Sequence, residues 1–115
     1  MQAEVRGIEA NDIADWPHWP PADVSCELEW FTVTIGPPGE SGADLFQVAV
    51  ATPRGLKDRR TKGKFVGLVV NRFDPPLVEQ AIREFVACSH ALTWQGVVDL
   101  LRAKMRWEFE GLRKE

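Results

Sequence analysis

Two carboxylates, Glu27 and Glu29, lie close together in a run that otherwise carries mainly apolar side chains. In an extended strand, side chains two residues apart share one face and lie about 7 Å from each other. A pair of carboxylates can act as the acid and the base of a glycoside hydrolase. Because no other residue of the sequence supports that chemistry, we interpret the pair as part of a solvated acidic strand face.

The chain has few other residues suited to catalysis or to metal binding. His18 and His90 are the only histidines, and neither belongs to a catalytic motif. Cys26 and Cys88 match no metal-ligand spacing, and in a reducing compartment such cysteines are usually buried apolar side chains and not disulfide partners. The nucleophile elbow and the glycine-rich phosphate loops are also missing. We therefore expect a protein that is not an enzyme and has no catalytic residues, metal or cofactor.

A dense cluster of basic residues lies in the middle of the chain. A basic cluster of this kind can bind the phosphate backbone of a nucleic acid. No aromatic residue is interleaved to stack on bases, and such a run is usually a solvated loop. A small nucleic-acid-binding module is therefore the alternative function. Its six bases are Arg54, Lys57, Arg59, Arg60, Lys62 and Lys64, opposed only by Asp58.

Charge is divided unevenly along the sequence. Residues 1–53 carry nine acids and one base, a net charge of −8, whereas residues 54–115 carry eight acids and thirteen bases, a net charge of +5. If the fold keeps the two regions apart, the resulting field would steer a charged macromolecular partner. If neighbouring strands mix them, the field disappears, and the sequence leaves both outcomes open.

The chain is organised around a predicted β-hairpin. Apolar runs at residues 31–35 and 45–51 flank a loop at residues 36–42 that contains two prolines and three glycines. The second run alternates Phe46, Val48 and Val50 with smaller or polar residues, which is typical of a strand with one buried face. Prolines stiffen the loop, and Gly36, Gly39 and Gly42 allow left-handed backbone angles. The hairpin is therefore predicted to display a rigid tip.

Two tryptophans, Trp16 and Trp19, lie in a proline-rich segment at residues 11–24 that suits neither a helix nor a strand. We favour a structural role for them, covering a sheet edge or the rim of the core, because loops of small domains often use aromatic residues as anchors. Tryptophan is also the residue most enriched at interface hot spots, so both remain candidate partner contacts.

The remaining patterns predict further strands and two late helices. In the longest strand, at residues 26–35, the apolar phase changes, which a bulge or burial on both faces would explain. The run at residues 65–73 is nearly continuous in apolar character and is predicted to be a central strand. A closing strand at the end of the chain is predicted to place Trp107 and Phe109 in the core. Thr52 and Pro53 start a short helix, Asp74 and Thr93 are predicted N-caps of longer ones, and both longer helices carry an apolar stripe. The other strands are at residues 3–8, 65–73 and 107–110, and the longer helices span 75–88 and the segment after Thr93.

The order of these elements predicts an α+β fold, a mainly antiparallel sheet of about five strands with two C-terminal amphipathic helices packed on one face. A length of 115 residues and an apolar fraction of 44% suit a single domain spanning 1–115. No apolar run reaches the roughly 18 residues of a membrane span, and the first ten residues lack the pattern of a signal peptide. We expect a cytoplasmic protein.

The hairpin and two later blocks resemble the immunity protein 8 family of bacterial polymorphic toxin systems. The similarity rests on short blocks whose order and spacing extend from Ala3 to Glu110. These blocks are Ile35-Gly36-Pro37, Gly39-Glu40, Gly42-Ala43-Asp44, Phe46, Val48, Val50, Thr52-Pro53, Thr93-Trp94 and Trp107-Glu108-Phe109-Glu110.

The resemblance implies a protein that binds a cognate toxin domain and blocks it. An inhibitor needs a rigid scaffold, a preorganised projecting surface and charge complementary to its target. We therefore expect Glu40 and Asp44, together with Glu27 and Glu29 if they share the exposed side, to meet a basic cleft such as that of a nuclease. Trp16 and Trp19 would add aromatic contacts. The sequence leaves open the oligomeric state and whether Cys26 and Cys88 are close in space.

Overall fold

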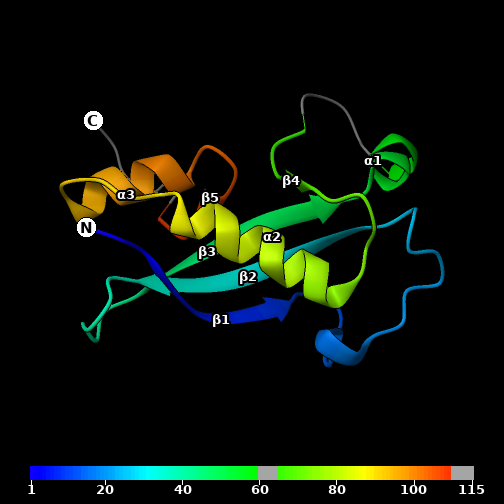
Figure 1. Ribbon diagram of the computed structural model, residues 1–115, viewed down its shortest axis with the longest axis horizontal. Coiled ribbons are helices and arrows are strands. Elements are labelled where there is room, and N and C mark those ends of the chain that lie inside the picture. The colour runs from blue at the N-terminus through cyan, green and yellow to red at the C-terminus, as the bar shows by residue number, and fades with distance from the viewer. Residues whose placement is uncertain (60–64, 110–115) are drawn as a thin grey trace.

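The chain folds into a sheet and a layer of helices over one of its faces (Figure 1). The computed structural model describes residues 1–59 and 65–109. In this part β1, β2 and β3 are consecutive antiparallel neighbours, while β4 and β5 both pair with the far edge of β3, in parallel and antiparallel orientation respectively. The predicted α+β fold with a mainly antiparallel sheet is confirmed. The strands are β1 (Glu4–Ala10), β2 (Leu28–Gly36), β3 (Asp44–Ala51), β4 (Leu68–Val69) and β5 (Arg106–Trp107).

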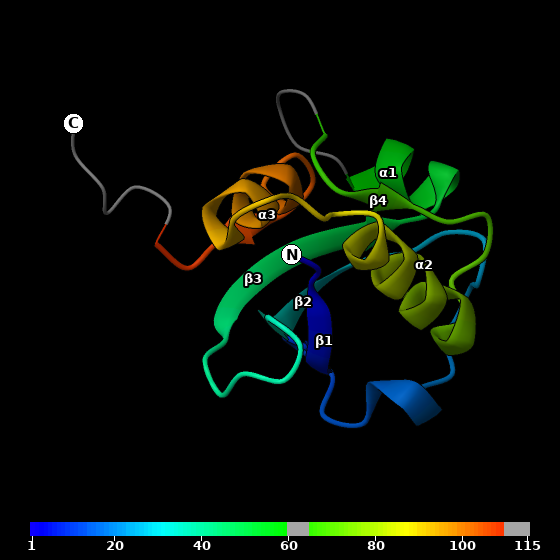
Figure 2. The same cartoon turned by 60° about the vertical axis from the view of Figure 1, so that its left-hand side comes forward.

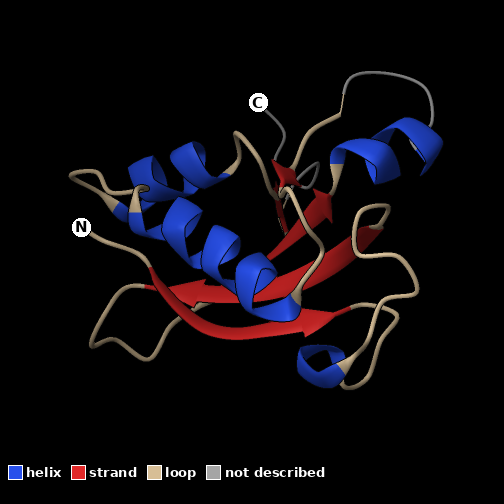
Figure 3. Ribbon diagram, turned by 45° about the vertical axis from the view of Figure 1, so that its right-hand side comes forward, coloured by secondary structure: helices blue, strands red, loops and turns tan. Residues whose placement is uncertain are grey.

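The helices start where the sequence places their caps. The Thr52 hydroxyl accepts a hydrogen bond from the Gly55 amide at 3.0 Å, and the Thr93 hydroxyl accepts one from the Gly96 amide at 3.1 Å. Asp74 occupies the N-cap position of α2, but its side chain makes no capping hydrogen bond. Figure 3 shows α2 crossing the sheet with α3 beside it. The helices are the 3₁₀ turn η1 (Trp16–His18), α1 (Pro53–Arg59), α2 (Pro75–Ala87) and α3 (Trp94–Leu101).

The core lies between the sheet and the two longer helices. Alternate residues of β2 and β3 point toward α2 and α3, whose apolar stripes are buried as predicted. Burial of each such side chain contributes about 2 kcal/mol, which makes this contact the main source of stability. The most deeply buried core residues are Phe31, Val33, Ile35, Phe46, Val48, Val50, Val78, Ile82, Val97, Val98 and Leu101.

Two predicted strands are much shorter than expected. The apolar run at 65–73 contributes only the two residues of β4, and Val66 and Val69 are about half exposed, so the prediction of a central strand is wrong. β4 runs parallel to the last two residues of β3 and cannot continue because β3 ends there. Similarly, β5 places Trp107 in the core but leaves Phe109 42% exposed, edge-on to Trp107. The prediction of a buried Phe109 is wrong, and Glu110 lies outside the described residues.

The change of apolar phase near Trp30 does not come from a bulge in β2. The register between β2 and β3 is continuous from Leu28 to Ile35, so Trp30 points away from the helices and is 39% exposed. Burial on both faces is therefore also wrong for this strand. The irregularity of the sheet lies in β1 instead, where the pairing with β2 shifts at Arg6.

Candidate partner-binding surface

The loop between β2 and β3 projects from one end of the sheet (Figure 1). Residues 38–43, which we call the hairpin tip, are all exposed, whereas Pro37 is buried. The Glu40 amide donates to the Pro37 carbonyl at 3.3 Å, and Gly39 has a φ of +78°. Proline followed by a left-handed glycine at the central positions defines a type II turn. Of the three loop glycines only Gly39 is left-handed, so that expectation is wrong for the other two.

Arg6 fastens the base of this loop. It is the extra residue of the bulge in β1, and a bulge redirects the side chain that it carries. Its guanidinium donates to the Gly42 carbonyl at 3.0 Å and to the Pro37 carbonyl, so it joins the two ends of the tip. Gly36 is required at this point, because a Cβ there would overlap the Gly42 carbonyl oxygen, a backbone atom, and would also lie 2.9 Å from the Arg6 guanidinium carbon. Arg6 therefore holds the tip in one conformation.

Asp44 fastens the same hairpin from the other side. Its Oδ2 accepts hydrogen bonds from the indole N–H groups of Trp107 at 3.1 Å and Trp94 at 3.4 Å. Next to it, the Leu45 amide donates to Glu108 Oε2 at 2.8 Å, and the Glu108 amide donates to the Leu45 carbonyl at 2.9 Å. The sequence blocks around Asp44, Trp94 and Trp107 therefore meet at one place in the fold.

The predicted acidic contacts do not form one cluster. Glu40 is exposed in the tip and Asp44 is half-buried at its base, but Glu27 and Glu29 lie at the other end of β2. A strand of this length separates them by on the order of 25–30 Å. Glu27 is only 5% exposed, so the interpretation of a solvated acidic face is wrong for it. Its carboxylate accepts a hydrogen bond from the Leu28 amide at 3.2 Å.

The two tryptophans of the proline-rich segment pack against the domain. The Trp16 ring is 5% exposed, lies edge-on to Phe31, and donates its indole N–H to the Ile8 carbonyl of the edge strand β1 at 3.1 Å. Trp19 is half-buried and lies edge-on to Phe73 at 5.9 Å. The predicted structural role at a sheet edge and core rim is confirmed, while contact with a partner stays a prediction.

The basic segment is only partly described. Arg54 donates to the Ser25 hydroxyl at 3.0 Å and lies 3.7 Å from Asp23, while Lys57 is exposed. Hydrogen bonds from Ser25, with a smaller contribution from the Arg54 charge, lower the pKa of Asp23. This ion pair joins the acidic and basic halves of the chain. Arg59 ends α1, and Arg60, Lys62 and Lys64 lie outside the described residues.

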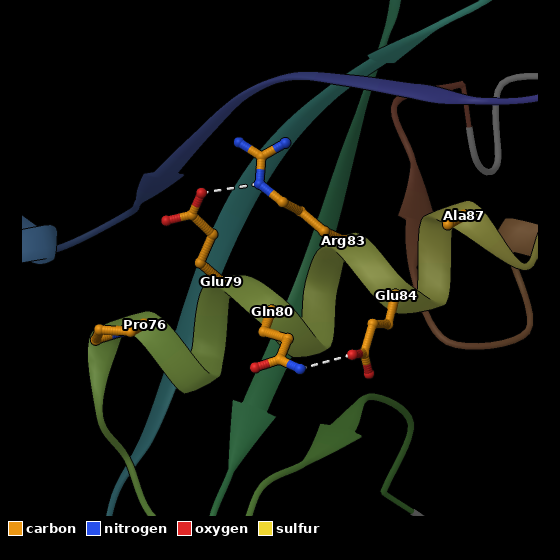
Figure 4. Close-up of a pocket in the computed structure, with 6 residues that line it drawn as sticks. All are labelled: Pro76, Glu79, Gln80, Arg83, Glu84 and Ala87. Carbon is orange, nitrogen blue, oxygen red and sulfur yellow. Dashed lines mark hydrogen bonds and ion pairs between the residues drawn. The ribbon is translucent and has the colours of Figure 1, made fainter.

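A shallow depression of about 480 Å³ follows the exposed side of α2 (Figure 4). Its polar side chains form hydrogen bonds to one another along the helix, Arg83 to Glu79 at 2.8 Å and Gln80 to Glu84 at 2.7 Å.

Within residues 1–59 and 65–109, no group of three or more His, Cys, Asp or Glu side chains is placed so that it could hold a metal ion. None of the helices described has the length and apolar character to cross a membrane.

Sequence reasoning missed Arg6 and the exposed Trp30. Arg6 stands out as the only base among the first 53 residues, but nothing near it in the sequence shows that it contacts the hairpin loop. Trp30 had a visible signal, because it breaks the apolar phase of its strand. The type II turn was also readable from the Pro38-Gly39 pair.

A loop that is fastened at its base and projects from a well-packed sheet would lose little conformational entropy on binding a partner. The comparison with known families is compatible with such a binding role. The family model described as immunity protein 8 matches residues 3–112, and the chain belongs to this family. Membership implies an immunity protein that acts against polymorphic toxins. Searches of curated proteins and of solved structures gave no match.

Proposed function

We propose that this protein binds the toxic domain of its cognate toxin in a one-to-one complex and inhibits it by covering the active site with the hairpin tip. The proposal rests on one observation: the tip is exposed, and Arg6 holds its base through hydrogen bonds to the Pro37 and Gly42 carbonyls. A loop already held in its bound conformation loses less conformational entropy on binding, which increases affinity. Inhibition by occupancy requires no catalytic group in the inhibitor.

The charge of the tip supports a basic target. Glu40 is exposed, and its carboxylate makes no ion pair or side-chain hydrogen bond within the described residues. It is therefore available to a cation of the partner, which a nuclease would present in the cleft that binds its substrate. Asp44 already accepts two indole N–H groups, so its part is to position the loop. Such an inhibitor acts in the cytoplasm of the cell that makes the toxin.

Nucleic-acid binding by the basic segment lacks a comparable observation. Arg54, its first residue, is engaged by Ser25 and Asp23 of the same chain. We therefore make no proposal for that function.

The test uses the toxin encoded next to this protein's gene. We expect a one-to-one complex by light scattering and loss of toxin activity at equimolar ratio. Glu40→Lys should weaken binding at least about tenfold, because it replaces an attraction with a repulsion. The matched control is Asp12→Lys, the same charge change at an exposed position near the opposite end of β1. Equal effects of the two variants would refute the role of the tip, and absence of any complex would refute the function.

A further inference from the structure

The face of the sheet opposite α2 and α3 carries no helix in the described structure (Figure 2). We call it the open face. Antiparallel sheets often leave one face to solvent, where polar side chains are then expected. Here three large apolar side chains interrupt the polar ones, Trp30 at 39% exposure, Leu45 at 43% and Val69 at 53%. A hollow of about 400 Å³ adjoins Trp30 and is lined also by Gln47, Arg106 and Glu108.

One row of side chains crosses the whole open face. Glu9 of β1 pairs with Thr32 of β2, Thr32 pairs with Gln47 of β3, and Gln47 pairs with Arg106 of β5. Directly paired residues of neighbouring strands point to the same side of a sheet. The row therefore has a carboxylate at one end and a guanidinium at the other.

Two of the polar groups in the middle of the row, the Thr32 hydroxyl and the Gln47 side-chain oxygen, already have hydrogen-bond partners. Asn11 donates to Gln47 Oε1 at 2.9 Å and accepts from the Thr32 hydroxyl at 2.7 Å. Covering these groups costs less than covering unpaired ones. The two ends differ, because Glu9 and Arg106 are exposed and neither has an ion-pair partner among the described residues.

This distribution of charge is complementary to itself. When two copies of the sheet meet face to face, a two-fold axis can run along the strands or across them. An axis across the strands puts Glu9 opposite Glu9 and Arg106 opposite Arg106. An axis along the strands, midway between β2 and β3, exchanges the two ends of the row and puts Glu9 of each copy opposite Arg106 of the other. Only the second arrangement pairs opposite charges.

We propose that the open face binds a second copy of this chain about a two-fold axis parallel to the strands. The same operation places Trp30 of each copy opposite Ala49 of the other, because Trp30 and Ala49 are register partners. Ala49 is only 2% exposed, so the Trp30 ring of the second copy meets the side chains that cover Ala49 within its own copy. Both hairpin tips then project from the same end of the dimer, so the proposal uses a surface separate from the tip.

The face is small for a permanent interface. Three strands of some 25 Å, together with the two-residue strands β4 and β5 along one edge, span at most on the order of 500 Å² per copy, which is near the low end for specific complexes. The dimer is therefore reversible. Its pairs are exposed to solvent at the edges, so added salt weakens it.

Charge reversal tests the arrangement by sedimentation equilibrium over protein concentrations up to about 1 mM. We expect wild type to dimerise, and Glu9→Arg and Arg106→Glu each to dimerise at least about tenfold more weakly, since each change creates two repulsive contacts. The decisive sample is an equimolar mixture of the two variants. In a mixed dimer every reversed end meets an opposite charge, so association should return to near the wild-type level.

The matched control is Glu84→Arg, a reversal on the exposed side of α2 that should leave dimerisation unchanged. Circular dichroism checks that each variant folds. A wild-type protein that stays monomeric throughout overturns the proposal, as does a mixture no stronger than either variant alone. A monomer whose toxin binding falls with Glu9→Arg would assign the open face to the toxin and equally overturn it.

Discussion

Replacing Arg6 with methionine removes both guanidinium hydrogen bonds to the hairpin loop while keeping the apolar part of the side chain. Hydrogen bonds from a charged donor contribute about 1.5–3 kcal/mol each. The low end applies here, because the Pro37 carbonyl keeps its bond from the Glu40 amide and the exposed Gly42 can be hydrated. Loss of the exposed pair with Glu4 adds less than about 1 kcal/mol. The free energy of unfolding should therefore fall by about 3–4 kcal/mol.

The same change should loosen the tip more than the rest of the fold. Freeing the equivalent of one ordered residue costs a binding partner about 1.4 kcal/mol, or about tenfold in affinity. Urea unfolding followed by tryptophan fluorescence measures the stability, and hydrogen exchange at the Glu40 amide measures the order of the turn. We expect that amide to exchange faster in the variant.

Arg83→Met is the matched control, since Arg83 makes one exposed helical ion pair with Glu79. Such pairs contribute about 0.3–0.5 kcal/mol, so its stability should change little. The role assigned to Arg6 would be refuted if both variants unfolded at the same urea concentration and the Glu40 amide exchanged at the wild-type rate.

Three further changes test other parts of the structure. Asp44→Ala should lower the free energy of unfolding in urea by about 2 kcal/mol, because it leaves two indole N–H groups without an acceptor. Asp44→Asn should lower it less. Equal losses in the two variants would contradict the indole contacts. Gly39→Ala should destabilise the protein by about 1 kcal/mol in thermal unfolding, because Gly39 has a positive φ. Gly42→Ala, with open space around it, should be neutral or slightly stabilising. The reverse order of stabilities would contradict the type II turn at Pro38-Gly39. The Asp58 carboxylate, which accepts a hydrogen bond from the Cys26 thiol, raises the pKa of that thiol. Less Cys26 thiolate is therefore present at pH 8 than without this contact. In a protein that carries Cys88→Ala, Asp58→Asn should increase the rate at which Cys26 is alkylated. An unchanged rate would contradict the contact between Asp58 and Cys26.

Local patterns predicted most of the elements because near neighbours in the chain decide them. The stripe of α2 and the Thr93 cap depend on residues within a few positions of one another. The hairpin between β2 and β3 likewise follows from alternation and from the Pro38-Gly39 turn. Each of these was predictable without knowledge of the tertiary structure.

The lengths of β4 and β5 were not predictable in this way. A strand extends only as far as its neighbour offers unpaired backbone groups, and both strands share the outer edge of β3. That limit belongs to a distant segment of the chain. An apolar run such as 65–73 contains no information about it, so burial of its alternate residues could not be predicted from the run alone.

The candidate site was predicted in position but not in composition. The exposed tip with Glu40 follows from the sequence. Grouping it with Glu27 ignored the length of the intervening strand, which was itself predicted and places the two carboxylates at opposite ends of the sheet. The bulge that directs Arg6 to the loop depends on how β1 pairs with β2, and nothing local to Arg6 signals it.

The residues that stabilise the hairpin lie at its base, whereas the residues proposed to recognise the partner lie in its tip. Asp44 and Arg6 hold the base of the hairpin from opposite sides, through contacts with segments far away in the sequence. A change at the base must therefore disturb the fold and the partner together. Side chains exposed in the tip, such as Glu40, make few contacts with their own domain, so under the proposed function a change of such a side chain acts on the partner with little effect on folding. If the tip contacts the toxin as proposed, this separation lets specificity change at the tip while the base keeps its contacts, because exposed loop positions tolerate substitution.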